Sequence, residues 1–291
     1  MKYIQLLRVK HYIKNMLIFL PVVFGMHLLE LDTDLRMMVG VLAFSLMSSV
    51  VYILNDIKDV EKDRMHYAKK NRPIASGRVS IRNAYSIAIL LFVLSIMLNY
   101  IILIYGGDKI KAWIMLIGYL LINVAYSLLN AKAVPLLDVI LLMSGFVVRV
   151  YYGSALSQIP VSDWMCLVVC SAAFYMGFGK RRNELSKYSG ETRQVLQFYT
   201  REFLDHAMNC CMTLTITFYS LWVLTQVQTG KTAGFIWSIS ILMVILFKYS
   251  MDIENTEGRG GGDPVEVIMA DRMLIVLAIG FVFYLGICLY F

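Results

Sequence analysis

The sequence has few charged residues for its length. Only 16% of its 291 residues are Asp, Glu, Lys or Arg, whereas 59% are hydrophobic and the mean hydropathy is +0.66. Soluble domains carry about a quarter charged residues, so this composition excludes a soluble globular protein and indicates a polytopic membrane protein. The net charge of +7 does not indicate nucleic-acid binding here, and its distribution along the chain is more informative than its size.

Several groupings that would carry other chemistry are also missing. The five cysteines lie in apolar segments without paired metal-ligand spacing, which favours small buried side chains over disulfides. His11, His27 and His206 have no companions that would form a Ser-His-Asp triad. No small-residue cleavage site follows the basic N-terminus, so no cleavable signal peptide is predicted.

Long apolar runs dominate what is present. Each is close to the roughly 20 residues that a helix needs to cross a bilayer core. Because backbone polar groups in lipid must be satisfied internally, we predict an all-α polytopic membrane protein, a bundle of nine transmembrane helices forming a single domain over residues 1–291. The predicted spans are 15–30, 35–54, 83–105, 112–130, 134–156, 163–179, 207–228, 233–250 and 273–291.

The basic residues are distributed unevenly between the two faces of this predicted bundle. If the N-terminus is cytoplasmic, the loops on that face hold the large majority of the 27 lysines and arginines. Such an asymmetry predicts a cytoplasmic N-terminus, with all large polar loops on the same side.

A dense polar segment, residues 55–82, separates the second and third predicted spans. On a helix, Asp56, Asp59 and Asp63 fall within an arc of roughly 60°, with Asn55 at its edge. Three carboxylates on one stripe repel one another unless a counter-charge is present. Hard oxygen ligands suit Mg²⁺, with Mn²⁺ as an alternative, so we predict a metal site. The alternative is a solvated loop whose acidic and basic residues screen each other.

Two groups of basic residues are predicted to bind phosphate. The first group follows the aspartates in the chain, and the second group begins the polar loop 180–206. The second group has another interpretation, anchoring at anionic lipid headgroups. The residues are Lys69, Arg72 and Arg78 in the first group, and Lys180, Arg181 and Arg182 in the second.

Two charged residues lie inside the fifth predicted span. Asp138 and Arg149 share a helix face within about 20° but are separated by roughly 16 Å along it, so they cannot pair with each other. They either mark a polar cavity or each pair with a neighbouring helix. Gly145 and Gly153 near Arg149 would allow a helix or ligand to approach closely. The Gly-rich stretch 258–262 is a weak phosphate-binding signal and is interpreted mainly as a connector.

The polar segment resembles a known family. Asn55-Asp56-x-x-Asp59-x-x-x-Asp63, followed by Arg-Pro-Ile-Ala-Ser-Gly at 72–77, is similar to the first aspartate-rich motif of the UbiA superfamily of intramembrane prenyltransferases. The resemblance implies a nine-helix fold. The superfamily's second aspartate-rich motif is absent, and residues 179–185 read Gly-Lys-Arg-Arg-Asn-Glu-Leu instead.

This replacement resembles the branch of decaprenyl-phosphate phosphoribosyltransferases. The stretches 8–15, 126–127, 135–139 and 145–149 are also similar to that branch, although Pro, Gln and Trp of its N-terminal motif are replaced. The resemblance implies transfer of 5-phosphoribosyl from phosphoribosyl diphosphate (PRPP) to a polyprenyl phosphate, with Mg²⁺, at the cytoplasmic face of a bacterial inner membrane.

The residues and the resemblance together define the expected site. Asp56, Asp59 and Asp63 are the expected catalytic metal ligands. The expected substrate-binding residues are Lys14, Asn55, Lys69, Arg72, Arg78, Tyr126, Asp138, Arg149, Lys180, Arg181, Arg182 and Glu184. Three alternatives remain: prenyl transfer to an aromatic acceptor, a transporter with Asp138 and Arg149 on an ion path, and a non-catalytic lipid-binding scaffold.

Overall fold

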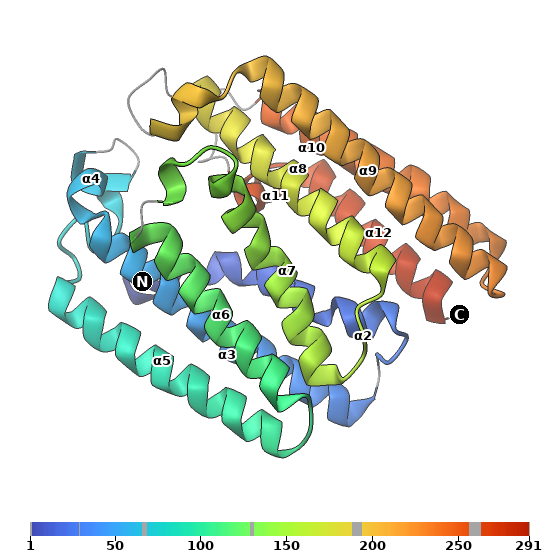
Figure 1. Ribbon diagram of the computed structural model, residues 1–291, viewed down its shortest axis with the longest axis horizontal. Helices are drawn as coiled ribbons and strands as arrows, with labels where there is room; N and C mark the ends of the chain where they lie inside the picture. The colour runs from blue at the N-terminus through green and yellow to red at the C-terminus, as the bar shows by residue number, and fades with distance from the viewer. Residues whose placement is uncertain are drawn as a thin grey trace. The chain divides into compact units, whose positions relative to one another are not determined.

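Helices make up all the regular structure among the residues described in this computed structural model, which are 2–28, 30–65, 69–128, 131–187, 194–255 and 263–290. In chain order (Figure 1) the elements are α1 (Lys2–Leu7), η1 (Val9–Phe19), α2 (Leu20–Phe24), α3 (Leu31–Lys58), α4 (Val60–Met65), η2 (Lys69–Asn71), α5 (Ile81–Ile104), α6 (Lys109–Leu128), η3 (Ala131–Ala133), α7 (Leu137–Ser157), α8 (Asp163–Lys187), η4 (Gln194–Phe198), α9 (Arg201–Gln228), η5 (Ala233–Ile236), α10 (Trp237–Asn255), α11 (Pro264–Ala270) and α12 (Arg272–Tyr290). Elements labelled η are 3₁₀ helices.

Within the described residues, seven segments are long and apolar enough to cross a membrane, which confirms the predicted all-α polytopic class. They centre on α3, α5, α6, α7, α9, α10 and α12. The count of nine is not confirmed within the described ranges. The predicted span 15–30 is divided between the 3₁₀ helix η1 and the five-residue α2, which has Pro21 in its first turn. The predicted span 163–179 is the apolar part of α8, whose C-terminal part is charged.

The chain divides into two compact units. Unit 1 comprises residues 1–131 and 148–160, and unit 2 comprises residues 132–147 and 161–291, so that α7 contributes to both. Each unit has its own hydrophobic core. The single domain remains a prediction.

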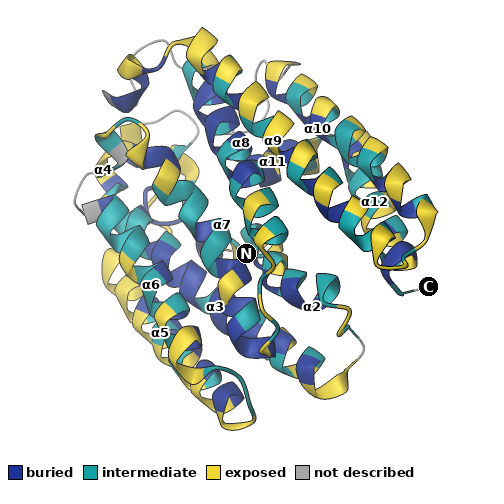
Figure 2. Ribbon diagram, turned by 45° about the vertical axis from the view of Figure 1, so that its right-hand side comes forward, coloured by how far each residue is buried: buried dark blue, intermediate teal, exposed yellow. Residues whose placement is uncertain are grey.

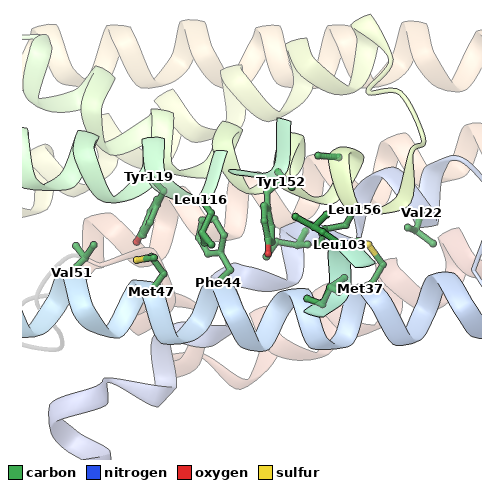
Figure 3. Packing of buried hydrophobic residues seen from close by; sticks show 14 residues of the cluster. Val22, Met37, Phe44, Met47, Val51, Leu103, Leu116, Tyr119, Tyr152 and Leu156 are labelled. Atoms are coloured by element: carbon green, nitrogen blue, oxygen red, sulfur yellow. The ribbon is translucent and has the colours of Figure 1, made fainter. Parts of the chain in front are cut away.

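Unit 1 is built around α3, which packs against α1, η1, α5 and α6. Its larger core gathers Phe44 and Met47 of α3, Tyr119 of α6 and Tyr152 of α7 (Figure 3). A second cluster lies toward the C-terminal end of α3 and includes Ile53. The apolar and small residues of α3 allow neighbours to cover most of this helix, so it can position the polar residues at its end.

Unit 2 packs α8 against α9 and α10 against α12. Its core includes Tyr175, Leu204 and Leu274. Exposed residues follow the length of α5 in unit 1 and of α12 in unit 2 (Figure 2). Many of them are large and apolar, such as Ile89 and Phe283, as expected for helices that face lipid. All five cysteines are free thiols.

Candidate functional site

The aspartates lie where α3 ends and α4 begins. Asp56 is in the last turn of α3, Asp59 is its C-cap and Asp63 lies in α4. Backbone hydrogen bonds from Asp59 to Asn55 (2.9 Å) and from Asp63 to Asp59 (2.8 Å) carry the helical spacing across this junction. Asp56 and Asp63 are each 3% exposed, whereas Asp59 is half-buried. Two of the three predicted metal ligands are therefore buried carboxylates on one side of the segment.

Two arginines provide the counter-charge for this pair of carboxylates. Arg72 Nη1 donates to Asp56 Oδ1 (3.1 Å) and to Asp63 Oδ2 (2.6 Å), so it bridges the two residues. Arg8 Nη2 also donates to Asp56 Oδ1, at 2.5 Å. We refer to Arg8, Asp56, Asp63 and Arg72 as the carboxylate–arginine cluster. Its formal charges cancel, so the two arginines offset part of the free-energy cost of burying the carboxylates.

Arg8 reaches this cluster from a strained turn between α1 and η1. Its backbone is left-handed (φ 53°, ψ 45°), a conformation that costs an L-residue about 1–2 kcal/mol. Its guanidinium lies 4.9 Å from the centroid of the Tyr52 ring, a cation–π contact. Sequence reasoning did not assign Arg8 to the site. Its signal in the sequence is its place at the start of the stretch 8–15, because a separation of 48 residues from Asp56 leaves no local spacing pattern.

Arg72 is positioned by buried apolar residues that follow it in the chain. Ile74 and Val79 are buried in the second core cluster of unit 1. A hydrogen bond from Val79 N to Pro73 O (2.9 Å) closes the turn. Gly77 has a φ of 74°, which glycine adopts without a steric penalty. This core contact holds the guanidinium of Arg72 next to the aspartates.

The other predicted phosphate-binding residues of unit 1 are less buried than Asp56 and Asp63. Arg78 is exposed and donates to Gln5 Oε1 (3.1 Å) and Ser76 Oγ (3.0 Å). Lys69 in η2 and Lys14 in η1 are half-buried. All three remain predictions as phosphate ligands.

Asn55 is tied to α6. Ser127 Oγ donates to Asn55 Oδ1, and Lys58 Nζ donates to the backbone oxygen of Ser127. The preceding residue, Tyr126, is half-buried. The last turn of α3 is therefore fastened to the end of α6, with the Asn55 oxygen engaged by a hydroxyl group.

Arg149 belongs to a buried network in unit 1. Its side chain, 4% exposed, donates through Nε to Asn15 Oδ1 (2.7 Å) and through Nη2 to the Tyr119 hydroxyl (3.3 Å). Its guanidinium also lies over the rings of Phe44 and Tyr119, and Asn15 Nδ2 donates to Ser45 Oγ (2.8 Å). Arg149 therefore has partners on neighbouring elements of unit 1, and its role in substrate binding remains a prediction.

Asp138 belongs to a separate network in unit 2. It accepts from Arg181 Nε and, at 2.7 Å, from the Tyr199 hydroxyl, which in turn accepts from Leu136 N (2.7 Å). Arg181 is fully buried and its Nη1 donates to Glu184 Oε2 (2.6 Å). Burial is the main reason why the pKa of Tyr199 rises to about 12, so the hydroxyl stays protonated and can donate to Asp138.

Arg182, adjacent in α8, is also paired within unit 2. It is 3% exposed and donates to Asp205 Oδ1 (2.5 Å) and Glu254 Oε1 (3.3 Å). Lys180 is half-buried. Phosphate would have to compete with these carboxylates for Arg181 and Arg182, whose phosphate-binding role remains a prediction. The Gly-rich stretch 258–262 lies outside the described residues.

The carboxylate–arginine cluster supplies two of the oxygen donors that a divalent metal prefers. Asp56 and Asp63 each place an oxygen within hydrogen-bond distance of the same Arg72 nitrogen, so their oxygens converge on one position. Oxygen-only donors suit Mg²⁺. Within the described ranges no three His, Cys, Asp or Glu side chains are grouped closely enough to hold a metal. The pair fits a divalent cation that takes its other ligands from water or substrate, and Asp59 remains a predicted third ligand.

The chain is similar to known proteins over most of its length. The model of the UbiA prenyltransferase family matches residues 18–259. The chain belongs to the UbiA prenyltransferase family. Within the family, it is 29% identical to the decaprenyl-phosphate phosphoribosyltransferase of Corynebacterium glutamicum, over 99% of this chain and 86% of the relative. It is 28% identical to the protein of that name from Mycolicibacterium smegmatis, over 99% and 92% of the two chains.

The UbiA fold is also evident from solved structures. A UbiA homolog from Archaeoglobus fulgidus, bound to GPP and Mg²⁺, superimposes with a TM-score of 0.72 at 18% identity, covering 100% of this chain and 99% of the homolog. At this identity the likeness concerns the fold alone.

Proposed function

We propose that this UbiA-family protein transfers the 5-phosphoribosyl group from PRPP to a polyprenyl phosphate in a bacterial inner membrane, with its site on the cytoplasmic side. The observation that supports this most is the similarity over 99% of the chain to two proteins named decaprenyl-phosphate phosphoribosyltransferase. The distribution of basic residues supports the orientation.

Asp56 and Asp63, with Asp59, are the residues that would hold Mg²⁺ against the diphosphate of PRPP. The metal, when bound, supplies charge neutralisation for the departing diphosphate. The bound Mg²⁺ of the A. fulgidus homolog supports a divalent metal for this fold. The buried carboxylates contribute orientation, because the helical junction and the Ser127 contact fix the end of α3.

Arg8 and Arg72 would bind the phosphate oxygens of the same substrate. A guanidinium matches phosphate geometry with two parallel donors, and both side chains are partly exposed (21% and 29%). Lys14, Lys69 and Arg78 are further candidates from the same unit. These charges would orient PRPP with its C1 atom toward the acceptor lipid.

The reaction itself needs little proton transfer. A phosphate oxygen of the polyprenyl phosphate attacks C1 of the ribose, most simply in line and with inversion. The C1–O bond to the diphosphate breaks, and diphosphate leaves with the electron pair. Since the attacking oxygen is already an anion, no general base is required. The protein's contribution is to position the substrates and offset their negative charge.

The test supplies membranes containing the protein with PRPP labelled in the ribose and with decaprenyl phosphate. The expected result is transfer of label into the organic phase with release of diphosphate. Asp56→Ala should reduce the transfer to background while the protein elutes as a folded species in detergent. Asp108→Asn, which alters a half-buried carboxylate paired with Lys111, is the control and should keep full activity.

Label that stays in the aqueous phase would contradict the proposal. Consumption of a prenyl diphosphate with an aromatic acceptor would then identify the alternative prenyl transfer. Flux across sealed vesicles without covalent change would identify a transporter. Asp138 and Arg149, the residues suggested for an ion path, belong to separate networks in different units.

A further inference from the structure

The carboxylate–arginine cluster is neutral before any metal is bound. Two buried carboxylates face two guanidinium groups, and three hydrogen bonds of 2.5–3.1 Å connect the four side chains. A divalent cation that reached Asp56 and Asp63 would therefore have to displace guanidinium groups. It would also add two positive charges next to two existing ones, at distances where like charges repel strongly.

Both arginines are held so that displacement would not remove them from the site. The backbone of Arg8 is fixed in a left-handed turn, and its guanidinium lies against the ring of Tyr52. Arg72 directly precedes the buried Pro73 and Ile74. A guanidinium that leaves a carboxylate would therefore stay within reach of an anion bound at the metal.

We propose that Arg8 and Arg72 act as built-in counter-ions, so that the site rejects a bare divalent cation and accepts the metal only together with a diphosphate. Asp56 and Asp63 would then hold the metal, and the two guanidinium groups would exchange carboxylate oxygens for phosphate oxygens. Metal and diphosphate would each raise the affinity for the other, as thermodynamic linkage requires. The inference rests on the proposed function only in taking the anion to be a diphosphate.

Arg8→Gln separates this role from a purely structural one, because it should change two affinities in opposite directions. Mn²⁺ alone should bind more tightly, by roughly tenfold, since one charge-assisted hydrogen bond no longer competes. Diphosphate in the presence of Mg²⁺ should bind more weakly by about the same factor, since one phosphate ligand is lost. A general disturbance of the site would weaken both.

The experiment uses the full-length protein in detergent. Mn²⁺ binding without any anion is measured from the loss of the free-ion EPR signal. Binding of ³²P-labelled inorganic diphosphate is measured by equilibrium dialysis with and without Mg²⁺. Arg36→Gln is the matched control because Arg36 lies at the other end of α3, where it donates to the Asp32 backbone oxygen (3.2 Å) and to Thr33 Oγ1 (3.1 Å), and should change neither affinity.

The wild-type protein already tests the proposal, whether or not a variant folds. Diphosphate must bind much more tightly with Mg²⁺ than without it, and a metal-independent affinity overturns the inference. Weaker or unchanged Mn²⁺ binding in folded Arg8→Gln and Arg72→Gln also overturns it. Neither measurement involves ribose or lipid, so failed phosphoribosyl transfer with intact coupling would reject the proposed function alone.

Discussion

Arg149 Nε donates to Asn15 Oδ1 at 2.7 Å, although 134 positions separate the two residues in the chain. Arg149 is buried and lies over two aromatic rings, so this amide oxygen is an important acceptor for a charge with little access to water. Because Asn15 belongs to η1, the contact also fastens the N-terminal segment to the α7 part of unit 1.

Replacing Asn15 with Leu should therefore destabilise the protein. The change leaves a buried guanidinium without this acceptor, a loss of about 1–3 kcal/mol. The measurement is the melting temperature in detergent, compared with Lys111→Gln, which breaks an exposed pair and should have almost no effect. Equal melting temperatures for the two variants would contradict the importance of the contact.

The Arg181–Asp138 pair allows a structural role to be separated from phosphate binding. Asp138→Leu should destabilise by about 3–5 kcal/mol, because it removes one partner of the fully buried Arg181. The double variant Asp138→Leu/Arg181→Met should recover part of this loss, since replacing both members of a buried pair is often neutral, although Glu184 also loses Arg181 as its partner. Thermal unfolding of the single and double variants gives the comparison.

Activity of the double variant then decides the role of Arg181. A folded double variant that retains phosphoribosyl transfer would show that the pair serves stability alone. A folded variant with a raised KM for PRPP or for the lipid phosphate would support Arg181 as a phosphate ligand.

Tyr199→Phe should have a smaller effect on the same network. It removes the hydroxyl that donates to Asp138 and accepts from Leu136 N, with a cost of about 1–3 kcal/mol. Leu136 has a φ of 65°, so this hydrogen bond supports a backbone conformation that leucine rarely adopts. The expected result is a lower melting temperature and faster hydrogen exchange at the start of α7. Unchanged exchange there would contradict this role.

Gly153 lies where α7 meets η1 in unit 1. A Cβ at this position would collide with the backbone oxygen of Ile18, which cannot move aside as a flexible side chain could. Gly153→Ala should therefore lower the melting temperature by several degrees, an overpacking cost of about 1–3 kcal/mol. Gly118→Ala in α6 is the matched control and should be neutral or stabilising, since no neighbour lies within 4 Å of the added methyl group.

Asp63→Asn tests the metal site independently of Asp56. It preserves the shape of the side chain but removes a charge from the pair bridged by Arg72. Transfer activity should fall by roughly 100-fold or more, because several kcal/mol of charge stabilisation depend on the metal. Raising the Mg²⁺ concentration should restore part of the activity if the change weakens metal binding. Full activity at low Mg²⁺ would contradict a ligand role for Asp63.

The sequence by itself determined the membrane class, because the length and hydropathy of the apolar runs are local properties. It also indicated the UbiA resemblance and the aspartate segment, since helical spacing depends only on nearby residues. It did not establish the number of spans. Residues 15–30 are apolar enough to suggest one helix, but the chain changes from a 3₁₀ to an α-helical conformation near Pro21.

Only the tertiary structure decided which charges meet. The pairs Arg8–Asp56, Asn15–Arg149 and Asp138–Arg181 join residues 48, 134 and 43 positions apart. Periodic patterns in a sequence relate only residues that are a few positions apart. These partners meet because the folded chain packs distant segments together, so no such pattern predicts them. The physical reason is desolvation: a charge buried in a helical bundle must find a partner, and the fold determines which one is near.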